Sequence, residues 1–276
     1  MTIYRLGLIG YPVSHSLSPR IQNAALQACG LEGEYSLFPI PPDDMQVLKN
    51  LLDRVRSGEI TGLNVTIPHK QNVIPFMDEL TPTAKAIGAV SVIYLRDQKL
   101  IGDNADAHGF LTDLKKVFDF SSLVTPASAL ILGAGGSARA VVYALLREGW
   151  NVTIAARRIE QAQELAIQFE KANAIELDLQ TSQLSDFQLI VNTTPLGMTP
   201  NIHTSPLPEN IVLPGHISVY DLVYNPRETK LVSDARSQGL NATTGLGMLI
   251  EQATRGFELW TGYKLSSEIF RNAVEQ

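Results

Sequence analysis

One stretch in the second half of the chain constrains the fold more than any other. Residues 128–158 read SALILGAGGSARAVVYALLREGWNVTIAARR. An apolar strand pattern over 129–132 runs into a glycine-rich turn, a helix pattern over 138–148 follows, and a second strand begins after Gly149. A strand, helix and strand within about thirty residues form a β-α-β unit, which requires parallel strands. The chain is therefore predicted to be an α/β protein.

The turn matches the G-x-G-x-x-A fingerprint of dinucleotide-binding proteins. Its glycines allow a tight turn and let backbone N–H groups approach a pyrophosphate at the helix N-terminus, where the helix dipole favours negative charge. A glycine-rich turn that binds no nucleotide is the alternative, but a preceding strand and a following helix are the context that the fingerprint requires. The six residues are Gly133, Ala134, Gly135, Gly136, Ser137 and Ala138.

The end of the second strand indicates which dinucleotide binds. NAD sites usually carry an acid about 20 residues after the turn, which accepts from the ribose 2′-hydroxyl. Here Ala156 is followed by Arg157 and Arg158. Guanidinium groups suit a 2′-phosphate in geometry and charge, so NADP is favoured. Glu160 could pair with one of these arginines and weaken the preference.

Composition excludes several classes of protein. The 276 residues suggest about two domains. A net charge of −6 argues against broad nucleic-acid binding. No apolar run reaches the roughly 18 residues of a membrane span, and the N-terminus lacks a secretory cleavage pattern. Cys29 is the one cysteine, and no Cys/His cluster has metal-ligand spacing. We expect a cytoplasmic protein without a metal, either a monomer or a homodimer.

Strand and helix patterns also alternate through the first part of the chain, up to about residue 118. This part includes a hairpin, AVSVIYLRDQKLIGDN, with Asp97 and Gln98 near its turn. A hinge is predicted at Ser121, Ser122, Thr125 and Pro126. The segment GLGMLIEQATRGFELWTG near the C-terminus is predicted to be a helix whose Phe257 and Trp260 lie in the core.

The motif GLNVTIPHK carries the first candidate for proton transfer. Asn64 and Thr66 point to the same face of a strand because side chains alternate. Pro68 is expected to start a helix with Lys70 in its first turn, where the helix dipole disfavours a cation. Such a break of a local rule is typical of functional sites. The alternative is an ordinary surface lysine.

Two further motifs add polar groups. In GDNADAHGF, Asp103 or Asp106 could hold a lysine beside a ketone or alcohol for proton transfer, or could cap the next helix. In GYPVSHSLSP, Ser14, Ser16 and Ser18 could bind an anion. They could also form a turn in which Ser18 caps the following helix.

Together these motifs resemble the shikimate dehydrogenase family along the whole chain. The matching blocks are SHSLSP, GLNVTIPHK, GDNADAHGF, LGAGGSARA, VNTTPLGM, DLVYNP and GLGMLIEQ. The resemblance implies a substrate domain over 1–118, joined by C-terminal helices over 245–276, and a Rossmann-type NADP domain over 119–244. It also implies an active-site cleft between the domains and the NADPH-dependent reduction of 3-dehydroshikimate to shikimate on the route to chorismate and aromatic amino acids.

The same resemblance implies roles for individual residues. Lys70 and Asp106 match the catalytic pair. The residues that match substrate-binding positions are Ser14, Ser16, Asn64, Thr66, Ser91, Tyr224 and Gln252, with the two serines on the substrate carboxylate. The residues that match the cofactor side are the turn Gly133 to Ala138, Arg157, Arg158, Thr193, Thr194, Pro195, Leu222, Gly245 and Met248.

Four departures from the family pattern keep alternatives open. Ser91 replaces an asparagine, and Ala105 removes a hydroxyl from a motif that keeps Asp106. Gln22 replaces a histidine, and 156–158 read Ala-Arg-Arg instead of Asn-Arg-Thr. A quinate/shikimate dehydrogenase that uses NAD or NADP is the alternative that Ser91 supports. A metabolite-binding protein without turnover is a further alternative, although the lysine and its acid are both present.

Overall fold

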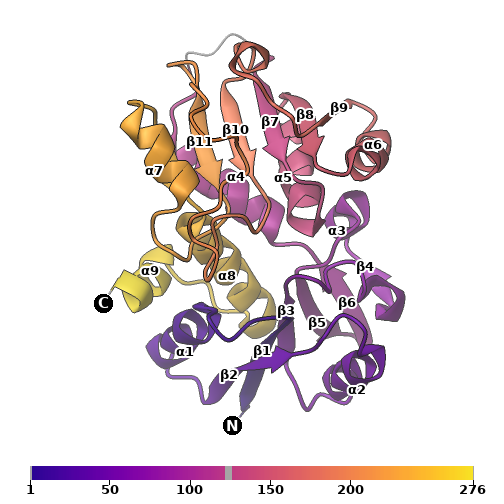
Figure 1. Cartoon of the computed structure of the whole chain (residues 1–276). Helices are drawn as coiled ribbons and strands as arrows, with labels where there is room; N and C mark the ends of the chain where they lie inside the picture. The colour runs from indigo at the N-terminus through magenta and orange to yellow at the C-terminus, as the bar shows by residue number, and fades with distance from the viewer. Residues whose placement is uncertain (1, 122–125, 276) are drawn as a thin grey trace. The chain divides into compact units, whose positions relative to one another are not determined.

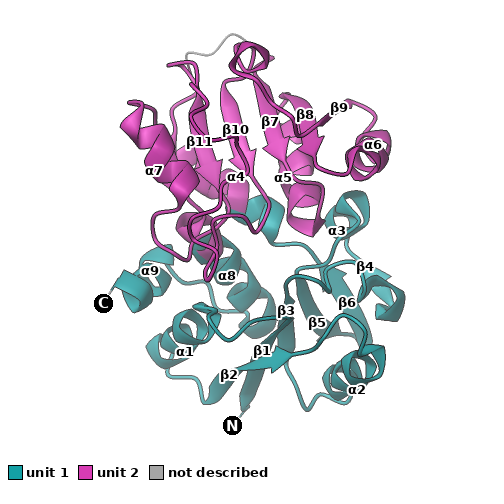
Figure 2. Ribbon diagram, viewed as in Figure 1, with its two compact units in different colours: residues 1–109, 250–276 teal, residues 110–249 magenta. Residues whose placement is uncertain are grey.

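Two six-stranded sheets organise the computed structural model (Figure 1), which describes residues 2–121 and 126–275. Each sheet belongs to one of two compact units (Figure 2): unit 1 comprises residues 1–109 and 250–276, and unit 2 comprises residues 110–249. The chain passes between the units within two helices, α4 (Asp106–Val117) and α8 (Leu246–Thr261). The α/β class is thereby confirmed. The domain limits at 118 and 245 stay a prediction, and Ser122 and Thr125 of the predicted hinge lie outside the described residues.

The sheet of unit 1 combines parallel and antiparallel strands in the order β2-β1-β3-β5-β6-β4. β1 is parallel to both β2 and β3 because helices α1 (Ser18–Ala28) and α2 (Met45–Arg56) form the crossovers. β5 is antiparallel to β3 and β6, whereas β4 is parallel to β6. The strands are β1 (Tyr4–Gly10), β2 (Gly33–Pro39), β3 (Gly62–Val65), β4 (Glu79–Leu80), β5 (Val92–Arg96) and β6 (Lys99–Asp103).

The predicted hairpin is confirmed as β5 and β6. Asp97 and Gln98 connect these strands with φ values of 51° and 60°. Positive φ at both central residues is what a two-residue type I′ turn requires, and its twist matches that of the strands. The hairpin returns the chain to the start of α4.

Spacing of apolar residues and capping explain the helices of unit 1. In α2, Leu48, Leu51, Leu52 and Val55 are all buried, so one face of the helix packs against the sheet. The Asp44 side chain accepts from the backbone N–H of residue 47 at 3.1 Å and caps this helix. Besides α4 and α8, the helices of unit 1 are α1 (Ser18–Ala28), α2 (Met45–Arg56), the 3₁₀ helix η1 (Ile74–Phe76), α3 (Pro82–Ile87) and α9 (Ser267–Glu275).

The sheet of unit 2 is entirely parallel, in the order β12-β11-β10-β7-β8-β9. After β9 the chain returns to place β10 beside β7, so the strand order reverses between these two strands. In such sheets the carboxyl ends of the strands at the reversal form the ligand-binding edge. The strands are β7 (Ser128–Leu132), β8 (Asn151–Ala156), β9 (Ala172–Glu176), β10 (Leu189–Asn192), β11 (Ser218–Asp221) and β12 (Ala242–Thr244).

The central strands of unit 2 are buried on both faces. Every residue of β10 and β11 is buried, as expected for parallel strands covered by helices on both sides. The strand and helix predicted around the glycine-rich turn are confirmed as β7 and α5. The helices are α5 (Gly136–Arg147), α6 (Ile159–Gln168), the 3₁₀ helix η2 (Thr181–Gln183) and α7 (Lys230–Ser237).

Candidate active site

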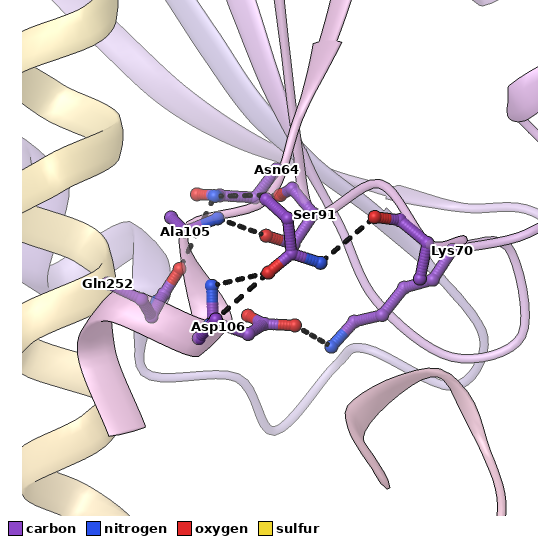
Figure 3. A network of polar contacts seen from close by, with 9 residues as sticks. Asn64, Lys70, Ser91, Ala105, Asp106 and Gln252 are labelled. Carbon is purple, nitrogen blue, oxygen red and sulfur yellow. Dashed lines mark hydrogen bonds and ion pairs between the residues drawn. The ribbon is translucent and has the colours of Figure 1, made fainter. Parts of the chain in front are cut away.

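A buried ion pair lies at the centre of the polar residues in unit 1. The Nζ atom of Lys70 lies 2.6 Å from Oδ2 of Asp106, and the two residues are only 8% and 5% exposed (Figure 3). Removing two charges from water carries a large desolvation penalty, so a buried pair is retained only with close and well-directed contacts. Lys70 is therefore not a surface lysine, and the structure brings the predicted catalytic pair together.

Asn104 places Asp106 in this pair. The Asn104 side-chain oxygen accepts from the backbone N–H groups of Asp106 and Ala107, at 3.0 and 3.3 Å, and its nitrogen donates to the carbonyl of Ala89 at 2.9 Å. The side chain that caps the start of α4 is thus that of Asn104, and of the two alternatives for Asp103 and Asp106 the structure supports the contact of Asp106 with the lysine rather than a helix cap. Asp103 instead accepts from the hydroxyl of Thr81 at 2.6 Å. This arrangement leaves the carboxylate of Asp106 directed at the lysine.

The segment around Lys70 corrects a second prediction. Residues 67–73 form turns rather than the first turns of a helix, and η1 begins only at Ile74. The carbonyl of Lys70 accepts from the N–H of Val90 at 2.8 Å. This carbonyl therefore bonds to a segment 20 residues further along the chain and not to the N–H of a following helical turn. His69 is fully buried, with its Nε2 2.7 Å from the carbonyl of Ile40. The position of Lys70 therefore follows from these anchors and from Asp106, and Lys70 does not lie in the first turn of a helix.

Ser91 connects the sheet to the start of α4. Its hydroxyl accepts from the N–H of Ala105 at 2.9 Å, and its carbonyl accepts from the side chain of Asn64 at 3.2 Å. Ser91 is 2% exposed. The hydroxyl of Ser91 therefore helps to hold the segment that carries Asp106.

Asn64 and Gln252 also belong to this group. Nδ2 of Asn64 donates to Oε1 of Gln252 at 3.5 Å, and both residues are at most 9% exposed. Figure 3 shows Asn64, Ser91 and Gln252 gathered beside the ion pair. Unit 1 thus brings together five of the predicted site residues: Asn64, Lys70, Ser91, Asp106 and Gln252.

The remaining candidates of unit 1 follow β1 and β3, two parallel neighbours. Thr66 is half-buried after β3, and Ser14 and Ser16 follow β1 as exposed and half-buried residues. The Ser16 hydroxyl accepts from the N–H of Ser18 at 3.2 Å, so Ser16, and not Ser18, supports the start of α1. A Cβ on Gly10 would lie 2.3 Å from Cγ2 of Thr66, so glycine there makes room for the threonine.

In unit 2 the glycine-rich turn leaves β7 at the carboxyl edge of the sheet. Gly133 has φ of +107°, and a Cβ there would lie 2.7 Å from Oγ1 of Thr193, so only glycine suits this position. Gly135 is the N-cap of α5, and a Cβ there would meet nothing within 4 Å. An open approach to the first N–H groups of a helix fits the pyrophosphate of a dinucleotide.

The loops after β10 and β11 lie at the same carboxyl edge and are tied together by one buried acid. Asp221 is fully buried and accepts from Asn192 Nδ2 at 2.8 Å, from Val223 N at 3.0 Å and from Thr229 Oγ1 at 2.7 Å. Burial raises the pKa of Asp221 to about 6, and these three hydrogen bonds only partly oppose the rise. The hydroxyl of Thr194 donates to Asn192 Oδ1 at 2.7 Å, so the loop after β10 is held by the same network.

The other cofactor-side candidates lie around these loops. Arg157 and Arg158 follow β8 and are both exposed, and the next acid along the chain, Glu160, lies in the first turn of α6. This donor set fits the additional phosphate of NADP better than a ribose hydroxyl. The residues near the strand ends and α8 are Thr193, Pro195, Leu222, Gly245 and Met248, and a Cβ on Gly245 would lie 2.2 Å from the carbonyl of Leu222. Tyr224 belongs to unit 2, unlike the other substrate-side candidates.

Sequence reasoning missed three residues that organise these sites: Asn104, Asp221 and Tyr35, a tyrosine of β2 whose hydroxyl donates to Oδ1 of Asn64 at 2.8 Å. Asn104 lies within the motif GDNADAHGF, and an asparagine two positions before a helix start is a recognisable cap signal. Asp221 closes an apolar strand, a pattern that marks the carboxyl edge of a parallel sheet. No local signal distinguished Tyr35 from an ordinary strand tyrosine.

Comparisons with known proteins agree with this geometry. Residues 8–93 match the family model of the shikimate dehydrogenase substrate binding domain, residues 115–207 that of shikimate / quinate 5-dehydrogenase, and residues 245–275 that of the shikimate 5′-dehydrogenase C-terminal domain. The shikimate dehydrogenase (NADP(+)) of Symbiobacterium thermophilum is 38% identical over 98% of this chain and 92% of its own length.

Two solved structures are similar over nearly the whole chain. A shikimate 5-dehydrogenase from Thermus thermophilus, in complex with NADP(H) and shikimate, has a TM-score of 0.85 and 34% identity, and the match covers 99% of this chain and 98% of that one. A quinate dehydrogenase from Corynebacterium glutamicum, in complex with NAD, has a TM-score of 0.87 and 29% identity, with 99% of each chain covered. At this identity and coverage the chain belongs to the shikimate dehydrogenase family.

Proposed function

We propose that this chain catalyses the reversible, NADPH-dependent reduction of 3-dehydroshikimate to shikimate on the route to chorismate and the aromatic amino acids. The observation that carries the proposal is the buried Lys70–Asp106 pair, 2.6 Å apart, in a chain whose second unit has a dinucleotide-binding turn. A buried ammonium group held by a carboxylate suits proton transfer to a ketone oxygen. The family membership supports the same reaction.

The cofactor side is assigned to unit 2. The turn Gly133 to Ala138 and the start of α5 would hold the pyrophosphate, because the backbone at Gly135 is open and the dipole of α5 favours an anion at its N-terminus. Arg157 and Arg158 would hold the 2′-phosphate, which an exposed pair of guanidinium groups suits in charge and shape. The loops after β10 and β11, fastened by Asp221, would border the nicotinamide portion.

The substrate side is assigned mainly to unit 1. Ser14 and Ser16 provide hydroxyl donors for the substrate carboxylate, since charge-assisted hydrogen bonds are the stronger kind. The ring hydroxyls would be bound by Asn64, Thr66, Ser91 and Gln252. Tyr224, which matches a substrate-binding position of the family, belongs to unit 2. Charged and polar groups of this kind in a largely buried setting favour one ligand over its analogues, because an unmatched polar group would be left without a partner.

The chemistry follows from the ion pair. When bound, NADPH supplies the hydride that reduces the ketone. Lys70 Nζ donates a proton to the substrate oxygen that becomes the hydroxyl. Asp106 keeps the ammonium group of Lys70 directed at this oxygen and accepts a hydrogen bond from a neighbouring substrate hydroxyl. In the reverse direction the same groups take up that proton. Asn104 and the turn over 67–73 keep both side chains in place.

The setting of the protein is also part of the proposal. Within residues 2–121 and 126–275, no helix is long and apolar enough to cross a membrane, and no cluster of His, Cys, Asp and Glu could hold a metal ion. We infer a small-molecule substrate, a cytoplasmic location, and a monomer or homodimer that binds neither nucleic acid nor membranes.

A second candidate function, quinate/shikimate dehydrogenase with NAD or NADP, is favoured by Ser91. Its short side chain already accepts from the N–H of Ala105, so it reaches less far than the amide that the family usually carries. A ring with an additional hydroxyl, as in quinate, is the substrate that such a site would admit. The similar quinate dehydrogenase structure supports the same alternative.

One experiment separates these possibilities. The purified protein is mixed with shikimate or quinate and with NADP or NAD, and the nicotinamide absorbance is followed in all four combinations. Turnover with shikimate and NADP, and little with the other pairs, is the expected result. Equal or faster turnover with quinate or NAD would move the assignment to the second candidate. No turnover with any pair, together with measurable binding of shikimate by calorimetry, would leave a metabolite-binding protein and overturn the enzymatic proposal.

A further inference from the structure

A buried tyrosine outside the proposed catalytic and binding residues contacts the substrate side of unit 1. Tyr35 lies on β2, is 4% exposed, and packs its ring at a tilt against Trp260, with ring centroids 6.3 Å apart. Its backbone N–H donates to the side chain of Asn23 at 2.8 Å. Its hydroxyl donates to Oδ1 of Asn64 at 2.8 Å.

The strand register explains how this hydroxyl reaches Asn64. Leu6 of β1 lies opposite both Tyr35 of β2 and Gly62 of β3, so these residues form one row across the sheet. Asn64 is the next residue of β3 on the same face as Gly62, because side chains alternate along a strand. The tyrosine side chain therefore extends along this face, past Gly62, to the asparagine.

The hydrogen bonds define the orientation of the amides in this relay. The carbonyl of Ser91 can only accept, so the Asn64 atom that faces it at 3.2 Å is Nδ2. Oδ1 of Asn64 then faces Tyr35, whose hydroxyl must be the donor. Nδ2 of Asn64 also faces Gln252 at 3.5 Å, so the atom that Gln252 turns toward Asn64 is its acceptor, Oε1. The amide nitrogen of Gln252 is consequently directed away from Asn64.

We propose that Tyr35 is a positioning residue for the substrate, which acts through Asn64 on Gln252. Its hydroxyl holds the Asn64 amide, and this amide keeps Oε1 of Gln252 occupied, so that Gln252 offers N–H donors to oxygen atoms of the substrate ring. The 3.5 Å contact between Asn64 and Gln252 is the longest hydrogen bond of the relay and therefore the weakest. This inference rests on the proposed function, because the ligand that Gln252 addresses is the proposed substrate.

Tyr35→Phe tests the relay, because phenylalanine keeps the ring against Trp260 and removes only the hydroxyl. Tyr94→Phe is the matched control: Tyr94 lies on β5 of the same sheet and is 6% exposed. Steady-state rates are measured with shikimate varied at saturating NADP and with NADP varied at saturating shikimate. Circular dichroism melting curves set an assay temperature at which all variants are folded.

The expected result is that Tyr35→Phe raises the KM for shikimate about tenfold, with little change in kcat or in the KM for NADP, while Tyr94→Phe behaves as the wild type. The decisive measurement is the same substitution in a Gln252→Ala background. There the further rise in KM should be less than about twofold, because residues that act through one another are not additive.

Two results would overturn the inference. An unchanged KM for shikimate in Tyr35→Phe would show that the hydroxyl has no part in substrate binding. A rise of the same size with and without Gln252 would show that Tyr35 acts by another route, such as general loosening of the sheet. Wild-type protein that neither turns over nor binds shikimate would instead refute the proposed function, and this inference with it.

Discussion

The buried carboxyl group of Asp221 makes a sharp prediction about stability and pH. Burial raises its pKa from 3.8 to about 6 in the folded protein. Below about pH 3 the group is protonated in both the folded and the unfolded chain. As the pH rises toward 6, the unfolded chain releases this proton first, so the unfolded state is stabilised relative to the folded state. The stability that protonated Asp221 provides is therefore lost as the pH rises through the folded pKa.

The size of this loss follows from the two pKa values. The difference between 3.8 and about 6, at roughly 1.4 kcal/mol per pH unit, corresponds to about 3 kcal/mol. Asp221 is 0% exposed, so solvent screening does not reduce this figure as it would for a surface group. In Asp221→Asn the titrating group is absent. The free energy of unfolding of the variant, minus that of the wild type, should thus rise by about 3 kcal/mol between about pH 3 and pH 7.

Urea unfolding at a series of pH values measures this difference. Trp150 lies in unit 2 with Asp221, whereas Trp260 lies in unit 1, so a Trp260→Phe background makes tryptophan emission report unit 2. Asp186→Asn, at an exposed aspartate of the same unit, is the control and should give a curve parallel to that of the wild type. A parallel curve for Asp221→Asn as well would refute the reasoning, because it would mean that Asp221 titrates alike in the folded and unfolded chains.

Three further predictions concern the two sites and the packing of β3 against Trp260. Lys70→Ala should lower kcat about 10²–10⁴-fold with little change in shikimate affinity, because general acid catalysis typically contributes that much; stopped-flow rates and calorimetry measure the two quantities. The double change of Arg157 and Arg158 to alanine should raise the KM for NADP about tenfold or more, and leave the KM for NAD nearly unchanged, because charge-assisted bonds to the 2′-phosphate are lost. Gly62→Ala should reduce the free energy of unfolding by about 1–3 kcal/mol in urea, because the new Cβ would lie 2.1 Å from the indole of Trp260.

Matched variants define what would contradict these three expectations. Lys85→Ala, at an exposed lysine of α3, should leave kcat unchanged, and near-normal turnover in Lys70→Ala would remove Lys70 from the mechanism. Equal losses for NADP and NAD in the arginine variant would refute a 2′-phosphate site. Gly58→Ala is the control for Gly62→Ala, because the Cβ added at Gly58 would have no neighbour within 4 Å. The φ of +77° at Gly58 adds local strain to this control. Equal stability of Gly62→Ala and the wild type would mean that the indole moves aside readily.

Patterns that depend on neighbours in the sequence were predicted correctly. The turn between β7 and α5, the hairpin of β5 and β6 and the helix α8 each rest on side chains or backbone angles within a few turns of one another. Phe257 and Trp260 are 0% and 7% exposed, as the spacing of apolar residues on α8 predicted. Such elements can be predicted from the sequence because the features that cause them, the periodicity of apolar residues and the conformations that glycine allows, are local.

The backbone around Lys70 could not be predicted in this way. Proline is frequent at helix starts, yet residues 67–73, which include Pro68, form turns. The carbonyl of Lys70 accepts a hydrogen bond from the N–H of Val90, and the ring of His69 is hydrogen-bonded to the carbonyl of Ile40. These partners come from other segments of the chain, and tertiary hydrogen bonds outweigh a weak local preference. The cap of α4 likewise went to Asn104, whose amide is fixed by the carbonyl of Ala89.

By itself the sequence determined which residue types were available: a lysine, acids, amides and hydroxyls after strands, and glycines and arginines in a β-α-β unit. Which of these residues are in contact depends on the tertiary packing. Lys70 and Asp106 are 36 residues apart, and Asn64 and Gln252 are 188 residues apart, yet each pair is in contact. The physical reason is that the pairing of β1, β3, β5 and β6, with α8 packed on the same unit, sets distances that no spacing along the chain encodes. Burial in that unit then makes each polar contact specific, because an unmatched group there would lose its water without gaining a partner.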